Sequence, residues 1–204
     1  MLPVLIEARL ATNLQERYGL EEKPEVEVSS GFPLELLLGR IDHIEVHIDH
    51  LRREGILLRE VRIVLEEVNL SVLSLLQEDL EREIQAASLV AEVPEESIND
   101  YLRENDLGLE GGEIDVRPQG VVYRSSDAFF GLSASVELDL RVAGPYTVEV
   151  IPQEATVGGF PLPSFLEEPL ASGGRTLTLS ELPLNTELMS VEPERNTLVV
   201  QAGR

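Results

Sequence analysis

The residues with most potential for chemistry are three histidines that fall within one short segment. His43, His47 and His50 are the only histidines among the 204 residues. Three apolar residues alternate with polar ones in this segment, and a period of two predicts a strand: Ile44, Val46 and Ile48. Strand residues two apart are separated by about 7 Å, so His43 and His47 lie about 14 Å apart, too far to share a metal ion. The segment therefore predicts a solvated strand face and no metal site.

Other catalytic chemistry finds little support in the sequence. The chain has no cysteine, which excludes disulfides, thiol catalysis and cysteine-ligated metals. It contains no nucleophile elbow (G-x-S-x-G), no P-loop and no G-x-G-x-x-G motif. Because 38 residues are acidic, a pair of carboxylates carries no information about a glycosidase-type site. We therefore expect no catalytic residues, no cofactor and no enzymatic activity.

The charge of the chain limits its partners. The formal net charge is -22, with 16 basic residues against the 38 acidic ones, and Lys23 is the only lysine. A protein without a basic stripe cannot displace counterions from phosphates, so nucleic acid is excluded as a partner. Adsorption onto anionic membranes also needs clusters of Lys and Arg. Any contact with a membrane should therefore be transient or depend on a local apolar patch.

Length and composition predict one globular domain over residues 1–204. Hydrophobic residues make up 43% of the chain but aromatic residues only 4%, so Leu, Val and Ile must form the core. No run of 18 apolar residues could span a bilayer. The first 20 residues do not resemble a signal peptide, because Glu7, Arg9 and Glu16 interrupt the region that would have to be apolar. An exported form would need a leader that this sequence does not include, and without one we expect a cytoplasmic protein.

Two helices are predicted from apolar spacing and end signals. Residues 3–18 place apolar side chains three or four positions apart, and Gly19 followed by Leu20 is typical of a helix end. A second helix is expected over about 96–104, after Pro94, with acidic residues in its first turn where the helix dipole favours them.

Most of the remaining chain alternates with a period of two, which predicts strands. Residues 41–51 and 56–68 form the first hairpin, and a weaker pattern places Ile84, Ala86, Ser88 and Val90 on one strand face. The clearest strand runs from Leu132 to Val142. Shorter strands are expected at 25–29, 114–116, 121–125, 146–150, 176–179, 188–191 and 198–200. The fold class is therefore α+β, with a long, strongly curved antiparallel sheet wrapped around amphipathic helices.

The length of the strand from Leu132 to Val142 has a consequence for the core. Eleven residues span about 36 Å, whereas a helix of about 15 residues spans only about 23 Å. A long sheet with few helices to pack on it predicts an internal apolar groove or tube that side chains do not fill.

Paired aromatic residues mark a second candidate site. Phe129 and Phe130 are adjacent, so both cannot point inward on a regular strand. They indicate either a bulge or turn with one partly exposed ring, or an apolar rim that touches lipid. Phe160 and Phe165, each close to prolines, allow the same two interpretations.

Six segments, in this order and spacing, carry a resemblance to a known family: Val26–Val28 leading into Gly31-Phe32-Pro33, Leu34–Leu38 with Gly39-Arg40, Val61–Val68, Val93–Leu102, Gly159–Pro163 and Leu182-Pro183-Leu184. The similarity extends from about Val26 to Gly203. In these segments the chain resembles the LmeA family of phospholipid-binding proteins, formerly a domain of unknown function (DUF2993).

The resemblance implies a fold similar to the tubular lipid-binding (TULIP) superfamily, in which a curved sheet wraps a helix around an apolar cavity. It implies binding or transfer of phospholipid, or of another ligand with acyl chains, in the bacterial cell envelope. It supplies no catalytic motif. The expected cavity-lining residues are Ile44, Val46, Ile48, Ile63, Leu65, Leu138 and Leu140, with Phe32, Leu34, Leu37 and Leu38 near the mouth and Phe129, Phe130, Phe160 and Phe165 at the rim. The alternative is a structural or adaptor module of the envelope that binds another protein through an apolar patch. The oligomeric state is left open.

Overall fold

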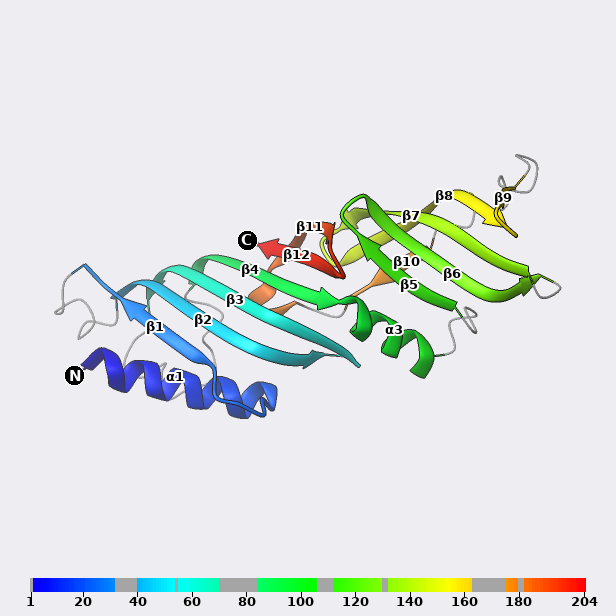
Figure 1. Cartoon of the computed structure of the whole chain (residues 1–204). Coiled ribbons are helices and arrows are strands. Elements are labelled where there is room, and N and C mark those ends of the chain that lie inside the picture. The colour runs from blue at the N-terminus through cyan, green and yellow to red at the C-terminus, as the bar shows by residue number, and fades with distance from the viewer. Residues whose placement is uncertain are drawn as a thin grey trace.

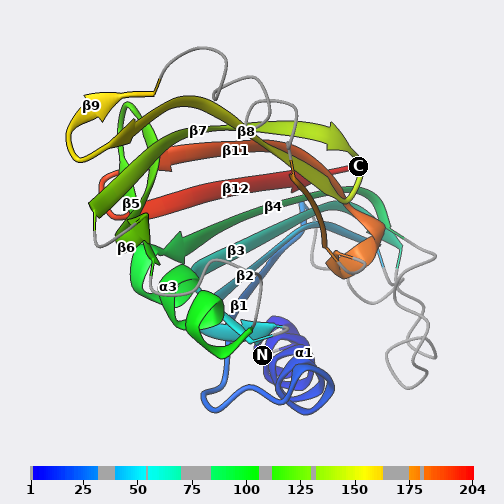
Figure 2. The ribbon, with the colours of Figure 1, turned by 90° about the vertical axis from the view of Figure 1, so that its right-hand side faces the viewer.

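The computed structural model of the chain describes residues 2–31, 40–53, 55–69, 84–105, 112–129, 132–162, 175–179 and 182–204. The molecule is elongated, with α1 at one end and the short strand β9 at the other (Figure 1). Seen along its length, its strands are strongly curved, and α1 and α3 lie toward the same, lower side (Figure 2).

Within the described residues, twelve strands form two antiparallel sheets. Sheet A has the order β1-β2-β3-β4-β12-β11 and comprises β1 (Glu25–Ser29), β2 (Arg40–Arg53), β3 (Ile56–Asn69), β4 (Ile84–Pro94), β12 (Thr197–Gly203) and β11 (Glu187–Glu194). Sheet B has the order β10-β8-β7-β6-β5, with β9 paired to β8. Its strands are β5 (Gly112–Arg117), β6 (Gly120–Phe129), β7 (Leu132–Gly144), β8 (Thr147–Val157), β9 (Phe160–Pro161) and β10 (Arg175–Thr178). The predicted α+β class with antiparallel strands is confirmed.

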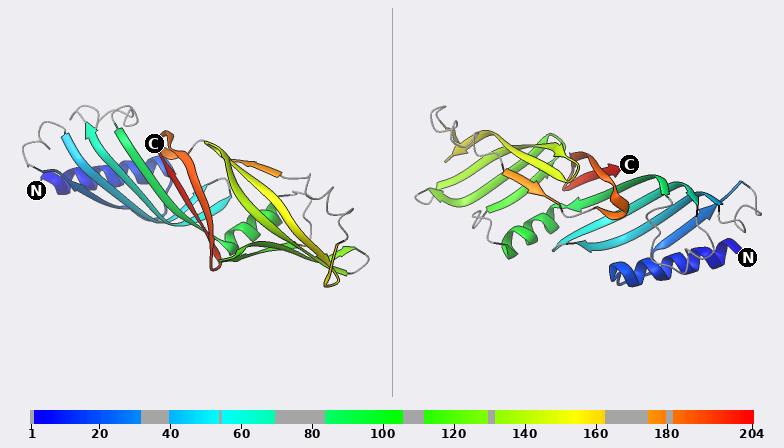
Figure 3. Two further views of the ribbon diagram at one scale, coloured as in Figure 1. Left: turned by 90° about the horizontal axis from the view of Figure 1, so that it is seen from above. Right: turned by 180° about the vertical axis from the view of Figure 1, so that it is seen from behind.

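The prediction named a single long antiparallel sheet, whereas the strands divide between two sheets that do not close. Strand β4 of sheet A ends at Pro94. The chain then forms α3 (Glu95–Glu104) and continues into β5 of sheet B. Side chains of α3 bond to the edge of β5, so that edge pairs with a helix instead of with a strand of sheet A. The two sheets lie side by side along the molecule (Figure 3).

The helix α1 (Leu2–Tyr18) packs on one face of sheet A. Its end has the predicted geometry: Gly19 has a φ of 62°, and the N–H of Leu20 donates to the carbonyl of Gln15 at 3.0 Å. The buried Leu10 joins the core of sheet A, together with partly buried residues of the same helix face: Ile6, Leu14 and Tyr18. The helical spacing of the sequence therefore identified the packing face.

The predicted hairpin is confirmed as β2 and β3, but the alternation of buried and exposed residues shifts by one position within each strand. Ile41 and Ile44 are both buried on β2, as are Leu65 and Val68 on β3, although each pair is three residues apart. Glu67 lies between the last two with a φ of 51°. A residue in this left-handed conformation reverses the alternation locally, so the apolar side chains on both sides of it face the same core.

The strand β4 exists as expected. Its core face, however, is formed by Ala87, Leu89, Ala91 and Val93. The predicted face turns outward, with Ser88 and Val90 exposed. Small alanines on the buried face hid the true period in the sequence. The segments 34–38, 70–76 and 164–170, for which the sequence alone favours short helical turns, lie outside the described residues.

Candidate functional site

One face of sheet B is mostly apolar, with Ser125 of β6 as a polar residue opposite Ala134. On β7 the residues of this face alternate with polar ones: Leu132, Ala134, Val136, Leu138, Leu140 and Val142. The register brings further apolar side chains beside them, because cross-strand partners share a face. Val121 and Pro152 flank Leu138, and Val148 of β8 flanks Val142. The result is a continuous apolar surface over β5 to β8.

An irregularity in β8 keeps this surface continuous. Val136 pairs with Ala155, whereas Leu138 pairs with Pro152, so β8 carries one extra residue between these pairs. The extra segment contains Gln153 and Glu154, which are both exposed. A bulge of this kind shifts the alternation by one residue. Apolar residues on both sides of the bulge therefore point to the same face.

The helix α3 occupies only one end of this apolar face. Its Ile98 and Leu102 pack against Ile114, Val116 and Val121 at the β5–β6 end, where those three residues are 1 to 9% exposed. On β7 the corresponding side chains from Val136 to Val142 are only partly buried, and Leu132 is 50% exposed. Burial on this face thus falls from β5 to β7, whereas Val148 and Ala155 of β8 are again buried.

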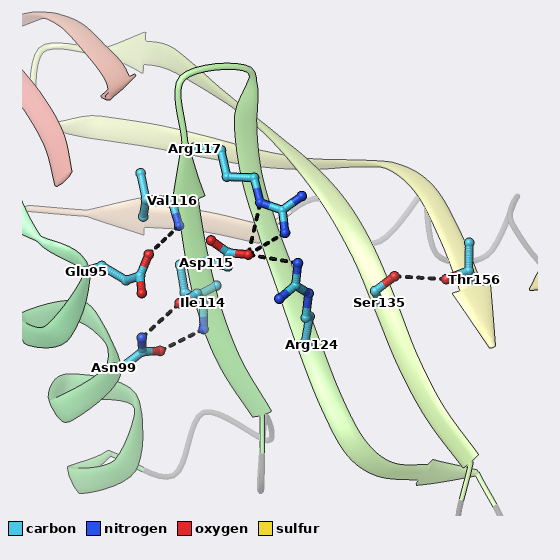
Figure 4. Close-up of polar contacts among 9 residues, drawn as sticks. All are labelled: Glu95, Asn99, Ile114, Asp115, Val116, Arg117, Arg124, Ser135 and Thr156. Atoms are coloured by element: carbon cyan, nitrogen blue, oxygen red, sulfur yellow. Dashed lines mark hydrogen bonds and ion pairs between the residues drawn. The ribbon is translucent and has the colours of Figure 1, made fainter. Parts of the chain in front are cut away.

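Two side chains of α3 hold the helix to the edge of β5 (Figure 4). The Asn99 amide donates from Nδ2 to the carbonyl of Ile114 at 2.8 Å and accepts at Oδ1 from its N–H at 2.7 Å. The carboxylate of Glu95 accepts from the N–H of Val116 at 2.7 Å, and the carbonyl of Val116 accepts from the N–H of Asn196 at 3.0 Å. The backbone N–H and carbonyl groups of Ile114 and Val116 at the edge of β5 therefore all have hydrogen-bond partners.

The same helix is tied to sheet A. The N–H of Leu57 in β3 donates to Ser97 Oγ at 2.6 Å, and the N–H of Glu95 donates to the carbonyl of Asn196 in the β11–β12 turn at 2.9 Å. Ser97 is buried, so its bond to Leu57 is partly shielded from water. α3 therefore fixes sheet B against sheet A.

The opposite face of sheet B is polar. Asp115 forms ion pairs with Arg117 at 2.6 Å and with Arg124 at 2.8 Å, and the hydroxyls of Ser135 and Thr156 are hydrogen bonded at 2.8 Å (Figure 4). All of these groups are partly or fully exposed to water. An apolar ligand therefore has one suitable face of this sheet, the face that carries Leu138 and Leu140.

The structure separates the predicted lining residues into two environments. Ile44, Val46, Ile48, Ile63 and Leu65 are 2 to 9% exposed in the core that α1 closes over sheet A. Leu138 and Leu140 lie instead on the partly exposed face of sheet B, and Phe160 is 77% exposed at its end. Phe129 ends β6, with only its backbone described, and the other candidates lie outside the described residues: Phe32, Leu34, Leu37, Leu38, Phe130 and Phe165. A ligand role for any of these residues stays a prediction.

Several residues of the sheet B face are not among the predicted site residues. Val136 belongs to the same alternating row as Leu138, so the period of β7 could have identified it. Tyr123 of β6 is its cross-strand partner, and its ring lies so close to Gly112 that a Cβ there would overlap the ring. Ile98 and Leu102 of α3 could be assigned to this face only from the tertiary structure, because their helical spacing does not indicate which sheet they pack against.

The histidines lie on the outward face of sheet A, as expected of a solvated strand. His47 Nε2 is 3.1 Å from Asp49 Oδ1 and 3.3 Å from Glu60 Oε2. Nearby, Arg62 Nε lies 2.6 Å from Glu45 Oε1, and this hydrogen bond holds the pKa of the Glu45 carboxyl below its ordinary value. Within the described ranges, no three His, Cys, Asp or Glu side chains are grouped so that they could hold a metal ion.

A membrane-spanning helix is also missing from the part of the chain that the structure describes, since neither α1 nor α3 is both long and apolar enough.

The fold and the apolar face define an α+β protein with a surface suited to an apolar ligand. The model of the LmeA-like phospholipid-binding family matches residues 1–203. The chain belongs to this family, which is a family of binding proteins and not of enzymes. Lipid binding in general, and phospholipid as the ligand class, follow from this membership. No curated protein and no solved structure matches the chain closely enough to refine the assignment.

Proposed function

We propose that the protein binds phospholipid without catalysing a reaction, and that the acyl chains lie along the apolar face of sheet B. The observation that carries the proposal is the contrast between the two sheets. The apolar residues of sheet A are closed off by α1, whereas Leu138 and Leu140 on β7 remain partly exposed. Apolar surface left in water costs about 25 cal/mol per Å², so an acyl chain that replaces this water is stabilised.

Partial exposure also supports transfer of lipid between membranes as the role of the protein. A ligand on a partly open face can leave without unfolding of the core, whereas a ligand inside sheet A would have to displace α1. Family membership favours a lipid over the protein ligand of the adaptor alternative. We place the protein in the bacterial cell envelope as part of this proposal.

The test compares the two faces of one strand. The double variant Leu138→Asn/Leu140→Asn makes the apolar row of β7 polar, and Asp139→Asn is the matched control on the opposite face between them. Binding of dispersed short-chain phosphatidylcholine is measured by native mass spectrometry and by calorimetry. We expect the double variant to lose at least about tenfold in affinity, since two apolar contacts are removed, and the control to bind as the wild type.

Equal affinity of the double variant and the wild type would remove sheet B as the lipid site. A wild type that binds no phospholipid would contradict the proposed function itself. Circular dichroism and urea unfolding of each variant show whether a loss of binding reflects loss of the fold.

A further inference from the structure

The end of sheet B farthest from α1 brings together the start of β7 and the β8–β9 turn, and neither carries a charged residue. Leu132 of β7 pairs with Phe129, and Val157 pairs with Phe160 across the β8–β9 turn. The N–H of Gly158 donates to the carbonyl of Ser133 at 2.8 Å, so the β8–β9 turn is bonded to the start of β7. We name residues 132–134 and 157–162 the distal tip; it lies at the opposite end of the molecule from the N-terminus (Figures 1 and 3).

The distal tip exposes large apolar side chains. Phe160 is 77% exposed and Leu132 50% exposed, and the glycines of the β8–β9 turn are exposed between them. Pairing with Val157 places Phe160 on the apolar face of sheet B, and Leu132 begins the row of β7 on that face. The tip is therefore the open end of the surface to which we assign the acyl chains.

The charge pattern of the sequence singles out this end. Charged residues make up 26% of the chain, yet none occurs in 128–136 or in 155–166, the two stretches that supply the tip. Asp127 and Glu137 bound the first stretch, and Glu154 and Glu167 the second. An exposed apolar patch on a protein with a net charge of -22 needs an explanation, because charge would improve its solubility.

We propose that the distal tip docks the protein, end first, onto the surface of a lipid bilayer with little negative charge. Phe160 and Leu132 enter the interface between headgroups and acyl chains, where aromatic and aliphatic side chains are stabilised. The acidic body is repelled by anionic lipid and stays outside the bilayer. This inference rests on the proposed function in one respect, since the docked tip joins the bilayer to the apolar face of sheet B.

The inference predicts an unusual dependence on salt. Peripheral proteins with basic patches leave anionic membranes when salt is raised, because their attraction is screened. In this protein, by contrast, salt screens the repulsion between the acidic body and anionic lipid. Binding to vesicles of phosphatidylcholine should change little with salt, whereas weak binding to vesicles that contain phosphatidylglycerol should increase as the Debye length falls from about 30 Å at 0.01 M to about 8 Å at 0.15 M.

The chain contains no tryptophan, so one introduced indole reports on its own surroundings. In Phe160→Trp the emission should shift to shorter wavelength with phosphatidylcholine vesicles, and brominated acyl chains should quench it. Met189→Trp is the control, because Met189 of β11 is 68% exposed outside the tip. Its emission should not change. The proposal would be overturned if vesicles did not change the emission of Phe160→Trp, or if they changed the emission of both variants equally.

Loss of function is tested by flotation with the same vesicles. Phe160→Asp and Phe160→Ser should each reduce the bound fraction at least about tenfold, whereas Met189→Asp should leave it unchanged. Because Phe160 also lies at the open end of the proposed lipid face, binding of dispersed short-chain phosphatidylcholine by both variants is measured as a reference. It should fall much less than vesicle binding, since no bilayer is needed for it. That combination supports docking, and a failure of short-chain binding in the wild type would instead count against the proposed function alone.

Two outcomes contradict docking directly. A wild type that does not float with either kind of vesicle has no membrane-docking tip. Concentration-dependent dimers that Phe160→Asp dissociates, with no vesicle binding, would assign the patch to a second copy of the chain. Sedimentation velocity of the wild type and Phe160→Asp distinguishes this case.

Discussion

The side-chain amide of Asn99 occupies the place of a missing neighbouring strand beside Ile114. It donates to the carbonyl and accepts from the N–H of this one residue, at 2.8 and 2.7 Å, in a buried environment. A backbone strand would offer the same donor and acceptor pair to the edge of β5. The contact allows a helix to end sheet B and to join it to sheet A at the same time.

We expect Asn99→Ala to lower the free energy of unfolding by about 2–4 kcal/mol. Two hydrogen bonds are lost, and a buried N–H and a buried carbonyl of Ile114 remain without partners. Urea unfolding measures the change. Asp100→Ala is the control on the exposed side of the same helix, where only an ion pair with Arg103 is lost, and it should change stability by less than about 0.5 kcal/mol. Similar effects of the two variants would show that the amide does not hold the edge.

The two apolar regions should respond differently to truncation. Ile44 is 2% exposed in the core of sheet A, so Ile44→Ala should cost about 2–5 kcal/mol through lost contacts and an internal cavity. Leu140 on sheet B is only partly buried, so Leu140→Ala should lower the free energy of unfolding by only about 1 kcal/mol. It should nevertheless weaken lipid binding, because Leu140 lies on the proposed lipid face. Urea unfolding and calorimetry with dispersed phospholipid provide the two readouts. An equal cost at both sites would argue that the face of sheet B is closed.

The positive φ of Glu67 makes an unusual prediction for β3. Glu67→Gly should raise stability by about 0.5–1 kcal/mol, because the left-handed conformation costs a non-glycine residue about 1–2 kcal/mol and glycine far less. Glu66→Gly is the control at the preceding, extended position. There glycine should destabilise the strand by about 0.5–1 kcal/mol. Thermal or urea unfolding of both variants measures these changes in stability. A loss of stability in Glu67→Gly would show that the backbone at Glu67 is not strained.

The contact between Glu45 and Arg62 predicts a dependence of stability on pH. The hydrogen bond from Arg62 lowers the pKa of Glu45 from its ordinary value of 4.5 in the folded state. The folded state therefore gains stability above pH 4.5, and it loses this gain as the pH falls through the lower folded pKa. The difference in urea midpoint between wild type and Glu45→Gln should be largest above about pH 5 and should shrink below pH 4.5.

Arg62→Met supplies the complementary measurement. Removing the guanidinium should bring the pKa of Glu45 back toward its ordinary value, and carbon-detected NMR titration of the carboxyl measures this directly. An unchanged titration of Glu45 in Arg62→Met would assign the low pKa to another cause.

The sequence by itself determined the elements of this protein. Helical spacing with Gly19-Leu20 located α1, and the alternation from Leu132 to Val142 located β7, because a period of 3.6 or 2 fixes which side chains share a face. It also determined the acidity and the absence of charge near Phe160, and the family resemblance identified phospholipid as the ligand class.

Only the tertiary structure decided which apolar face is closed. The alternating rows of β2 and β7 look alike in sequence, yet α1 buries the row of Ile44 while the row of Leu138 stays partly exposed. The division into two sheets depends on Asn99 and Glu95 reaching the edge of β5, contacts between residues 15 and 21 positions apart. Local periodicity specifies the direction of a side chain, but burial depends on which distant element packs against it, and that choice belongs to the whole fold.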